Sequence, residues 1–530
     1  MNPAPLSPDT PETWPGLDWG DQELQRLAKL RQLRALGVDP YPPRFERTAT
    51  ASEALAAYSA WEADNPPTGS DQQASPIQVR LAGRVLARRI LGKLSFAQLG
   101  DSSGRIQLYF DGKTLLEPPL DYEAFKRLLD LGDHIGAEGH LLRTKTGEIS
   151  LYVTRWWMLS KALEPLPEKW HGLQDHEIRY RRRYLDLLSN DEVRRVFLLR
   201  SAIVSALRRY LDGQGFLEVE TPVLQAIYGG ATAQPFITHH NQLDQDLYLR
   251  IADELYLKRL VVGGFERVYE IGHDFRNEGI DYKHNPEFTM MECYQAYGDY
   301  NTMMELVEGA VSTIAGEVLG TTTVRFRGAE LDLAPPWRRV TMRAALQEAT
   351  GIDFAAHYDD QPGLYAQAQA LVAREPGTPA ARALAAALHP RLSWTKLLDE
   401  LVGNYVEPLL IQPTFLCDYP AALSPLAKRN PADPQLVERF EAFANGMELG
   451  NAFSELNDPL DQYLRFAAGA TAHDQGDAEA HIMDLDYIGA LMVGLPPTGG
   501  LGLGVDRLVM LLADQDSIRD VVLFPHMRAR

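Results

Sequence analysis

The sequence predicts an α+β protein in which a small N-terminal β-barrel precedes a larger domain of mixed strands and helices. Its 530 residues are too many for one ordinary core, so two or three domains are expected. A composition of 45% hydrophobic and 23% charged residues is normal for a soluble globular chain. Short strand-like runs fill residues 77–159, and longer helical patterns mixed with strands follow from residue 191.

The N-terminal segment precedes the barrel. Residues 1–20 are rich in Pro, Asp and Glu and lack the basic and apolar stretches of a signal peptide, so they predict a flexible acidic tail. Within residues 21–76 we expect a helix and a linker. The linker is indicated by Asp, Pro, Gly and Ser in residues 58–76. The helix, ended by Gly37 and Pro40, is predicted by the helical spacing of Leu24, Leu27, Leu30, Leu33 and Leu36.

Residues 77–164 predict the barrel. About five short strands are separated by turn signals at 101–104 and 145–147, and a helical insert is expected at 122–131. This pattern favours a barrel of the OB type, and a generic small barrel remains the alternative that spacing alone leaves open. Residues 165–185 indicate a hinge or linker.

Residues 186–530 predict the larger α+β domain, with its strands grouped together. A long amphipathic helix is expected from Asp191 to Leu211 with Asn190 as its N-cap, and Gly213 and Gly215 end it. A short strand follows at 216–220. The Ala-rich stretch 365–388 indicates a helical insertion at the surface.

A hairpin around Arg276 carries the first group of residues suited to ligand chemistry. Strand residues two apart share a face, so Arg276 and Glu278 are expected to point the same way. The planar fork of an arginine suits phosphate, an aromatic ring suits a base, and carboxylates suit a cation. A lone hairpin of this kind would more often be an edge with surface salt bridges. The hairpin contains Arg276, Glu278, His284, Asn285, Phe288, Met290, Glu292 and Tyr294.

A glycine-rich strand forms the second group. Glycines at every second position from Gly500 to Gly504 bare one side of the strand, so that a ligand can approach the backbone. A helix is expected to start near Asp506, with Arg507 in its first turn, where both the helix end and the guanidinium favour anions. Taken alone, such a strand is more often a packing feature.

An acidic strand forms the third group. Asn451, Phe453 and Glu455 alternate onto one face, and Glu441 and Glu448 are hard oxygen donors suited to Mg²⁺ bound to phosphates. Glu448 has the opposite parity from Glu455, so both reach one site only if the strand bulges, which we expect at Gly450. Unaided, these acids would more often be surface residues.

Charge and cysteine content constrain the partners. A formal net charge of -20 argues against a general nucleic-acid binder, yet residues 78–110 hold six Lys/Arg against one acid, so a polyanion could still dock locally. The two cysteines, Cys293 and Cys417, form no CxxC pair and fit a reducing cytoplasm. No apolar run approaches the length of a membrane span.

Together these segments closely resemble the signature regions of class II aminoacyl-tRNA synthetases. Residues 191–224 resemble motif 1, which forms the homodimer, residues 266–297 resemble motif 2, and residues 498–514 resemble motif 3. The preceding barrel matches the subgroup that serves lysine, aspartate and asparagine. The strings HNPEFTMMECYQAY and GNAFSELND resemble the bacterial lysyl enzymes. The resemblance implies an OB-fold anticodon-binding domain and a catalytic domain built on an antiparallel sheet flanked by helices.

The resemblance also implies the reaction and its ATP site. The chain would activate L-lysine with ATP and transfer it from lysyl-adenylate to tRNA(Lys), without a protein nucleophile or an indispensable general base. Arg276 and Arg507 would be the catalytic residues, on the α-phosphate and the γ-phosphate, and Glu441 and Glu448 would bind Mg²⁺. The ATP-binding residues would be Arg276, Glu278, His284, Asn285, Phe288, Glu448 and Arg507.

Specificity for lysine would come from an acidic pocket. Glu455 is the residue implied for the ε-ammonium group, where an aspartyl enzyme should place an arginine or lysine. The lysine-binding residues implied are Gly230, Glu254, Glu292, Tyr294, Asn451, Phe453, Glu455 and Gly502. In the barrel, the resemblance assigns the anticodon to Phe96, Gln107, Glu148, Arg80 and Arg84, with Arg88 and Arg89 as further help, although Phe96 could equally be a core residue.

Some positions depart from the family, and other readings remain. Gly272 and His273 stand where Asn and Arg are typical, Gly100 replaces a larger residue, and residues 353–400 match weakly. An aspartyl or asparaginyl enzyme, a paralogue that lysylates a translation factor, a lipid-lysylating enzyme and a non-catalytic RNA-binding paralogue are the alternatives. The acidic pocket, the barrel, the lack of membrane spans and the intact motif residues argue against each in turn.

Overall fold

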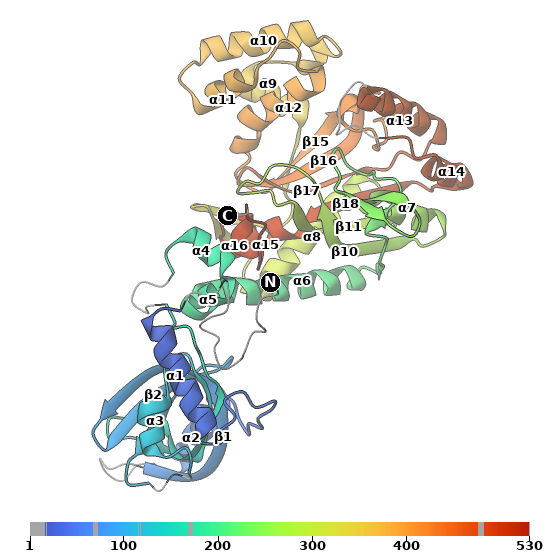
Figure 1. The fold of residues 1–530 in the computed structure, drawn as a ribbon. Helices are drawn as coiled ribbons and strands as arrows, with labels where there is room; N and C mark the ends of the chain where they lie inside the picture. The colour runs from blue at the N-terminus through green and yellow to red at the C-terminus, as the bar shows by residue number, and fades with distance from the viewer. Residues whose placement is uncertain are drawn as a thin grey trace. The chain divides into compact units, whose positions relative to one another are not determined.

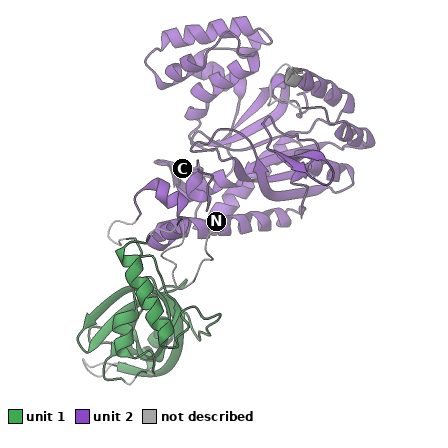
Figure 2. Cartoon of the chain, in the orientation of Figure 1, with its two compact units in different colours: residues 1–172 green, residues 173–530 purple. Residues whose placement is uncertain are grey.

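The computed structural model describes residue 16 and residues 19–66, 73–114, 116, 118–167, 173–474 and 482–528. The chain forms two compact units, residues 1–172 and residues 173–530 (Figure 2). Each has its own buried core. The expected acidic tail of residues 1–20 lies mostly outside the described residues.

The first unit is a closed β-barrel with helices packed on it. The strands follow the order β1-β2-β3-β5-β4 around the barrel. Alternate residues point inward, among them Val85, Leu99 and Leu151, and these are fully or almost fully buried. The prediction of a small OB-type barrel is therefore confirmed. The elements are α1 (Asp21–Ala35), α2 (Ala51–Asp64), β1 (Gln73–Leu91), β2 (Leu94–Gly100), β3 (Arg105–Asp111), α3 (Tyr122–Leu128), β4 (His134–Arg143) and β5 (Ile149–Ser160).

The segment 58–76 is not a simple linker. Helix α2 continues to Asp64, and strand β1 begins at Gln73, while residues 67–72 lie outside the described residues. Thr50 accepts a hydrogen bond from the Glu53 backbone, and the Glu53 carboxylate accepts one in return, which closes a capping box at the start of α2. The prediction gave too much weight to the polar residues after the helix and missed this cap.

A hinge or linker was expected at residues 165–185, but the second half of this segment is helical. Helices α4 (His176–Arg181) and α5 (Arg183–Ser189) occupy it. The buried Arg183 guanidinium donates to the carbonyl oxygens of Leu523 at 2.9 Å and Arg519 at 2.7 Å. These contacts attach the segment to the C-terminal end of the chain, so it belongs to the second unit.

The second unit is built on an eight-stranded sheet in the order β14-β15-β16-β17-β18-β11-β10-β6 (Figure 1). Its central pairs are antiparallel, as expected, but the pairs β14–β15 and β10–β6 at its edges are parallel. The strands are β6 (Leu217–Glu218), β10 (Arg267–Phe275), β11 (Glu287–Ala296), β14 (Arg338–Thr341), β15 (Thr414–Pro420), β16 (Leu436–Ala444), β17 (Met447–Ser454) and β18 (Thr498–Gly504). Smaller sheets contain β7 (Leu224–Gln225), β8 (Ile237–His240), β9 (Gln245–Leu249), β12 (Thr323–Phe326) and β13 (Ala329–Asp332).

Helices pack against this sheet and bury its core. Ile203, Leu207 and Leu211 of helix α6 are buried in the core, and helix α8 also contributes buried residues to it. Asn190 precedes α6 as expected but makes no side-chain cap hydrogen bond. The helices are α6 (Asp191–Gly213), α7 (Glu254–Val262), α8 (Tyr300–Leu319), α13 (Pro459–Asp474), α14 (Leu485–Gly494), α15 (Val505–Ala513) and α16 (Ile518–Val521).

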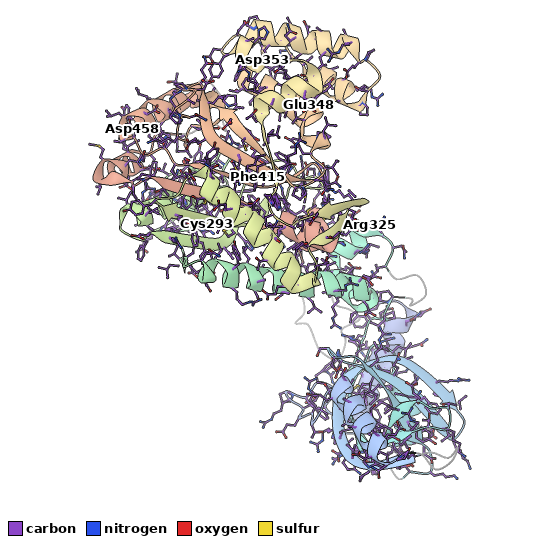
Figure 3. All side chains as sticks on the ribbon, turned by 180° about the vertical axis from the view of Figure 1, so that it is seen from behind. Cys293, Arg325, Glu348, Asp353, Phe415 and Asp458 are labelled. Atoms are coloured by element: carbon purple, nitrogen blue, oxygen red, sulfur yellow. The ribbon has the colours of Figure 1, made fainter. Side chains whose placement is uncertain are left out.

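The Ala-rich stretch forms part of a helical insertion between β14 and β15, as predicted. Figure 3 labels Glu348 and Asp353 in this insertion. It has its own core, which includes Leu346, Leu364 and Leu397. Its helices are α9 (Met342–Thr350), α10 (Gln361–Arg374), α11 (Pro379–Ala387) and α12 (Trp394–Tyr405).

Both cysteines are free thiols inside the second unit. Cys293 lies on β11 and Cys417 on β15, and both side chains are buried in the core. Burial raises the pKa of the Cys293 thiol, and it raises the pKa of Cys417 to about 12. The thiols are therefore protonated at neutral pH. Among the described residues, no helix is long and apolar enough to cross a membrane.

Candidate active site

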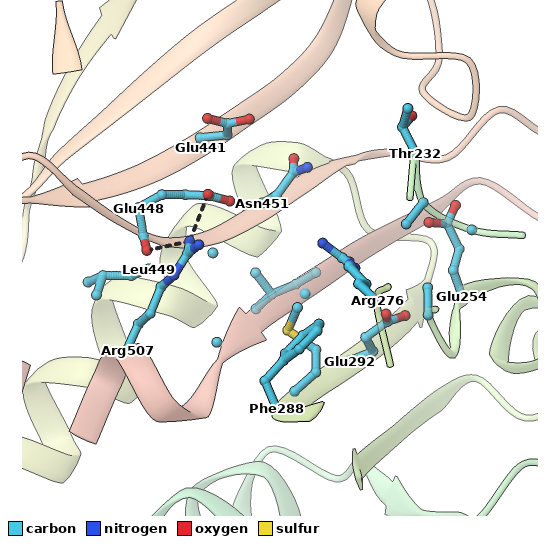
Figure 4. A pocket seen from close by; sticks show the side chains of 18 of the residues that line it. Thr232, Glu254, Arg276, Phe288, Glu292, Glu441, Glu448, Leu449, Asn451 and Arg507 are labelled. Atoms are coloured by element: carbon cyan, nitrogen blue, oxygen red, sulfur yellow. Dashed lines mark hydrogen bonds and ion pairs between the residues drawn. The ribbon is translucent and has the colours of Figure 1, made fainter. Parts of the chain in front are cut away.

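A cavity of about 410 Å³ opens over the centre of the large sheet (Figure 4). Strands β11, β16, β17 and β18 form its floor, and the starts of α7 and α15 and the loop after β10 form its walls. Of the catalytic-domain residues predicted from the sequence, all but Glu455 line it. They are Gly230, Glu254, Arg276, Glu278, His284, Asn285, Phe288, Glu292, Tyr294, Glu441, Glu448, Asn451, Phe453, Gly502 and Arg507.

The glycines of β18 make room above β11. Glu292 stands opposite Gly502 in the antiparallel pair, and Tyr294 stands opposite Gly500. A Cβ atom at Gly502 would meet nothing closer than 3.9 Å, so this position is open to a ligand. A Cβ atom at Gly500 would lie 1.9 Å from Oε1 of Glu455, so no other residue fits there without moving that carboxylate.

Arg276 and Glu278 both reach the cavity, although not for the expected reason. Strand β10 ends at Phe275, so strand alternation does not orient them. The Arg276 guanidinium lies 5.1 Å from the centre of the Phe288 ring, and its Nε donates to the Ile251 carbonyl oxygen at 3.3 Å. These contacts aim a cation across an aromatic face that can stack on a base.

Arg507 is held at the start of α15 by the neighbouring strand. Its Nη1 donates to the Glu448 carboxylate at 2.8 Å and to the Glu448 carbonyl oxygen at 3.0 Å, as Figure 4 shows. Burial opposes ionisation of Glu448, but the charges of Arg507, Arg439 and Arg276 and the hydrogen bond from Arg507 together outweigh it and lower the pKa of Glu448. Helix α15 begins at Val505, which confirms the helix start expected near Asp506.

The bulge expected near Gly450 is present. Gly450 pairs with Ala442 and Glu448 pairs with Phe443, so Leu449 is the extra residue. The bulge brings Glu448 to the same cavity as Glu441. Burial and the charge of Glu448 raise the pKa of Glu441 to about 7, and Arg439 donates to Glu441 at 2.6 Å.

The two carboxylates fit a divalent cation that arrives with a nucleotide. Both acids are half-buried and repel one another, and a bound cation would relieve that repulsion. Within the described part of the chain, no group of three or more His, Cys, Asp or Glu residues could hold a metal. Mg²⁺ in nucleotide sites usually takes phosphate oxygens and water as its further ligands.

Acidic residues gather at the opposite end of the cavity, around Glu292. Glu292 accepts hydrogen bonds from the Tyr294 hydroxyl at 3.0 Å and the Asp253 amide at 3.2 Å. Burial, together with the charges of Asp274 and Glu254, raises the pKa of Glu292 to about 8. This end of the cavity therefore gathers acidic groups that can ionise when a ligand with ammonium groups binds.

Sequence reasoning missed Lys258, which explains the position of Glu455. Lys258 is fully buried on α7, and its ammonium group pairs with Glu254 at 2.5 Å and with Glu455. Glu455 is 1% exposed and stands behind the cavity wall rather than in the lining. The spacing of Glu254 and Lys258, four residues apart on a helix, was the available signal.

The predicted anticodon residues lie on the barrel of the first unit. Phe96 on β2 is half-buried and meets the Tyr109 ring edge-on at 5.3 Å between centroids. Gln107 on β3 accepts a hydrogen bond from Ser150 at 2.8 Å, and Glu148 is exposed beside β5. Because Phe96 pairs with Tyr109, two residues along β3 from Gln107, both predicted side chains share one face.

Three of the four arginines of β1 named above donate hydrogen bonds within the barrel itself. Arg80 donates to the Glu138 carboxylate at 2.7 Å, and Arg84 donates to the Gly132 carbonyl oxygen at 2.9 Å. Arg88 donates to the Leu129 carbonyl oxygen. Arg89 stands directly opposite Phe96. Of the four, Arg89 is therefore the one placed beside the predicted base-stacking residue.

Comparison with known proteins agrees with this geometry. Residues 175–528 match a family described as tRNA synthetases class II (D, K and N), and residues 79–159 match the OB-fold nucleic acid binding domain. The chain is 55% identical over 516 residues to a lysine–tRNA ligase of Roseiflexus castenholzii, which covers 97% of this chain and 100% of the relative. It is 53% identical over 515 residues to that of Chloroflexus aurantiacus, which covers 97% and 99%.

Proposed function

The chain belongs to the class II tRNA synthetases of the D, K and N group, and within them to the lysine–tRNA ligases; from this membership we propose how its cavity activates L-lysine with ATP and passes it to tRNA. The observation that carries the proposal is the division of the cavity. Arg507, Glu441 and Glu448 lie toward one end, Glu254 and Glu292 lie toward the other, and Arg276 stands beside these two acids and points toward the middle of the cavity.

The first end would hold ATP. Phe288 would stack on the adenine, Arg276 would contact the α-phosphate, and Arg507 would reach the γ-phosphate from the other side of the base. Glu278, His284 and Asn285 would complete the nucleotide contacts. Glu441 and Glu448 would hold Mg²⁺, which would supply charge to neutralise the phosphates.

The acidic end would hold lysine. Arg276 is placed to draw the lysine carboxylate toward the α-phosphate, while Glu254, Glu292 and Glu455 offer negative charge to its ammonium groups. Gly230, Tyr294, Asn451, Phe453 and Gly502 would complete the pocket. The carboxylate then attacks the α-phosphate and pyrophosphate leaves, so that positioning and charge stabilisation replace a protein nucleophile. The terminal hydroxyl of tRNA would displace AMP in the second step.

The other partners follow the same membership. We propose that the OB barrel reads the tRNA(Lys) anticodon through Phe96, Gln107 and Glu148. We also propose a homodimer through α6 and the strand after it, β6, where Leu198 is 67% exposed and Leu217 is 48% exposed. A cytoplasmic location is consistent with the two free cysteines.

The test is ATP–pyrophosphate exchange without tRNA, with lysine, aspartate and asparagine as parallel substrates. We expect exchange with lysine alone in the wild type. Glu455→Gln should lower kcat/KM for lysine about 100-fold or more, because it removes one buried carboxylate partner of an ammonium group. Exchange driven by aspartate or asparagine would overturn the lysine pocket, and no exchange with any of the three would overturn the enzymatic role.

A further inference from the structure

Lys258 places a positive charge beneath the acidic end of the cavity. Its Nζ lies 2.5 Å from Oε1 of Glu254 and forms a second ion pair with Oε2 of Glu455. The ring centroids of Phe453, Tyr487 and Tyr294 lie 5.5, 5.9 and 6.0 Å from the same nitrogen. Carboxylates and aromatic faces therefore replace the water that a fully buried ammonium group has lost.

Lys258 lies among three acidic side chains at this end of the cavity. Glu254, Glu292 and Glu455 bring three carboxylates together, and Lys258 supplies one positive charge among them. Burial raises the pKa of each of these three carboxyl groups, so protons occupy part of the group until ammonium groups of a ligand replace them. A neighbouring network, in which Arg250 pairs with Asp253 at 2.8 Å and with Glu270 at 2.6 Å, meets this group at Glu292, which accepts a hydrogen bond from the Asp253 amide.

The same contact orients Glu455. Its Oε2 is taken by Lys258, whereas its Oε1 is buried and has no hydrogen-bond partner in the structure. That second oxygen lies 1.9 Å from the position of a Cβ at Gly500, and Gly500 lines the cavity. The unpaired oxygen therefore lies against Gly500, directly behind this part of the cavity wall.

We propose that Lys258 is a positioning residue that holds the Glu455 carboxyl group turned toward Gly500, and that it thereby sets the pocket to accept an amino acid with two ammonium groups. This inference rests on the proposed function and adds a specificity-determining residue to it. Lys258 touches neither ATP nor the reacting carboxylate. Its effect should therefore appear in lysine binding and not in ATP binding.

Loss of the Lys258 charge would change the protonation of the pocket. The titratable groups that face Lys258 are Glu254 on its own helix, Glu455 after β17, Tyr487 on α14, and Glu292 and Tyr294 on β11. Burial already raises the pKa of Glu455, and Lys258 opposes that rise. Without Lys258, one further carboxyl group would hold a proton at neutral pH and would have to release it before lysine binds.

The test compares Lys258→Met with Arg259→Met in the full-length chain. Methionine keeps a long apolar side chain between the aromatic rings. Arg259 is the matched control, because it is the next residue of α7 and pairs with Asp484 at 2.9 Å and Asp486 at 3.0 Å on and beside α14, outside the cavity. We expect Lys258→Met to raise KM for lysine about tenfold or more at pH 7.5, with KM for ATP changed less than about twofold.

The pH profile gives a second readout that a merely structural role would not move. In Lys258→Met, KM for lysine should fall more steeply between pH 6.5 and pH 8.5 than in the wild type, since an additional proton must leave. Arg259→Met should keep the wild-type profile. An unchanged or lowered KM for lysine in Lys258→Met would overturn the proposal, because Lys258 would then be neutral to the substrate or would compete with it.

A third readout needs no substitution and applies even if the variant does not fold. Norleucinamide carries one ammonium group, whereas lysinamide carries two, and neither has a carboxylate that can be activated. In wild-type exchange assays, lysinamide should inhibit at a concentration about tenfold lower than norleucinamide, which leaves a buried carboxyl group unpaired. Equal inhibition would mean that the second ammonium group gains nothing in this pocket, and it would overturn the proposal. A wild type with no lysine-dependent exchange would instead defeat the proposed function itself.

Discussion

Glu292 shows how one side chain can set the conditions under which the cavity binds its substrate. The carboxyl group is 5% exposed, and its pKa is raised to about 8 by burial and by its acidic neighbours. In the empty pocket it is therefore mostly protonated at neutral pH. An ammonium group binds the ionised form, so lysine must displace a proton below pH 8.

KM for lysine in the exchange reaction should accordingly fall as pH rises from 6 toward 8, by at most about tenfold per pH unit for one proton, and then level off. A raised carboxyl pKa also means that the substrate-free protein loses stability as pH rises through 8, so stabilisation by lysine should grow over the same interval. Thermal shifts with saturating lysine measure this. Glu292→Gln should flatten the pH dependence. A profile that stays steep in Glu292→Gln would assign the proton to another group.

At this scale the sequence predicted residue types better than their partners. Arg276, Phe288 and Arg507 could be chosen because their motifs resemble a known family, and all three line the cavity. The pairing of Glu455 with Lys258 could not be foreseen, because the two residues are almost 200 positions apart and meet only through the fold. Sequence spacing reports neighbours on one element, not contacts between elements.

Strand β18 is the element on which the shape of the cavity depends most. Its alternate glycines do not serve the same purpose. Gly500 accommodates the Glu455 carboxylate and the Tyr294 ring, whereas a Cβ atom at Gly502 would meet its nearest neighbours only at 3.9 Å. Two substitutions in one strand can therefore separate protein packing from ligand binding.

Gly500→Ala should lower the melting temperature by several degrees and weaken lysine binding strongly, because the new methyl group displaces Glu455. Gly502→Ala should leave the melting temperature within about 1 °C of wild type, since its methyl group meets only ordinary contacts, and should raise KM for the substrates by narrowing the cavity. Differential scanning calorimetry and exchange kinetics provide the two measurements. Equal melting temperatures for the two variants would contradict this assignment.

Elements with a regular spacing of side chains could be predicted from the sequence. Elements whose bounds depend on a single cap or on the exact end of a strand were predicted less well. The bulge beside Gly450 was expected because Glu448 and Glu455 have opposite parity, and the structure has it at Leu449. Helix α2 was missed because its capping box at Thr50 and Glu53 lies before the segment that looked like a linker. Arg276 was expected on a strand, but the strand ends one residue earlier.

At the scale of the whole molecule, the two units divide the proposed reaction between them. Amino-acid activation would need only the cavity of residues 173–530, whereas selection of tRNA would need the barrel of residues 1–172. The sequence indicated this division through a change from short strand-like runs to longer helices. It could not indicate that segments around residues 230, 254, 276, 451 and 502 meet in one place, since this follows from the strand order β17-β18-β11-β10.

Phe96→Ala should separate the two activities. Stacking of one base on an aromatic ring contributes about 1–3 kcal/mol, so KM for tRNA in aminoacylation should rise about tenfold or more. Lysine-dependent exchange without tRNA should remain at the wild-type rate, and this serves as the internal control. If Phe96 is instead a structural residue of the barrel, the substitution will lower the melting temperature and leave KM for tRNA unchanged.

The burial of both cysteines makes the protein convenient to label. Cys293 and Cys417 are the only two thiols in the chain, and both are enclosed in the core and protonated at neutral pH. Maleimide reagents react with exposed thiolates, so the folded wild type should remain unmodified. A cysteine introduced at the exposed Glu148 would then be the one reactive position, and a fluorophore attached there would report directly on the arrival of an anticodon.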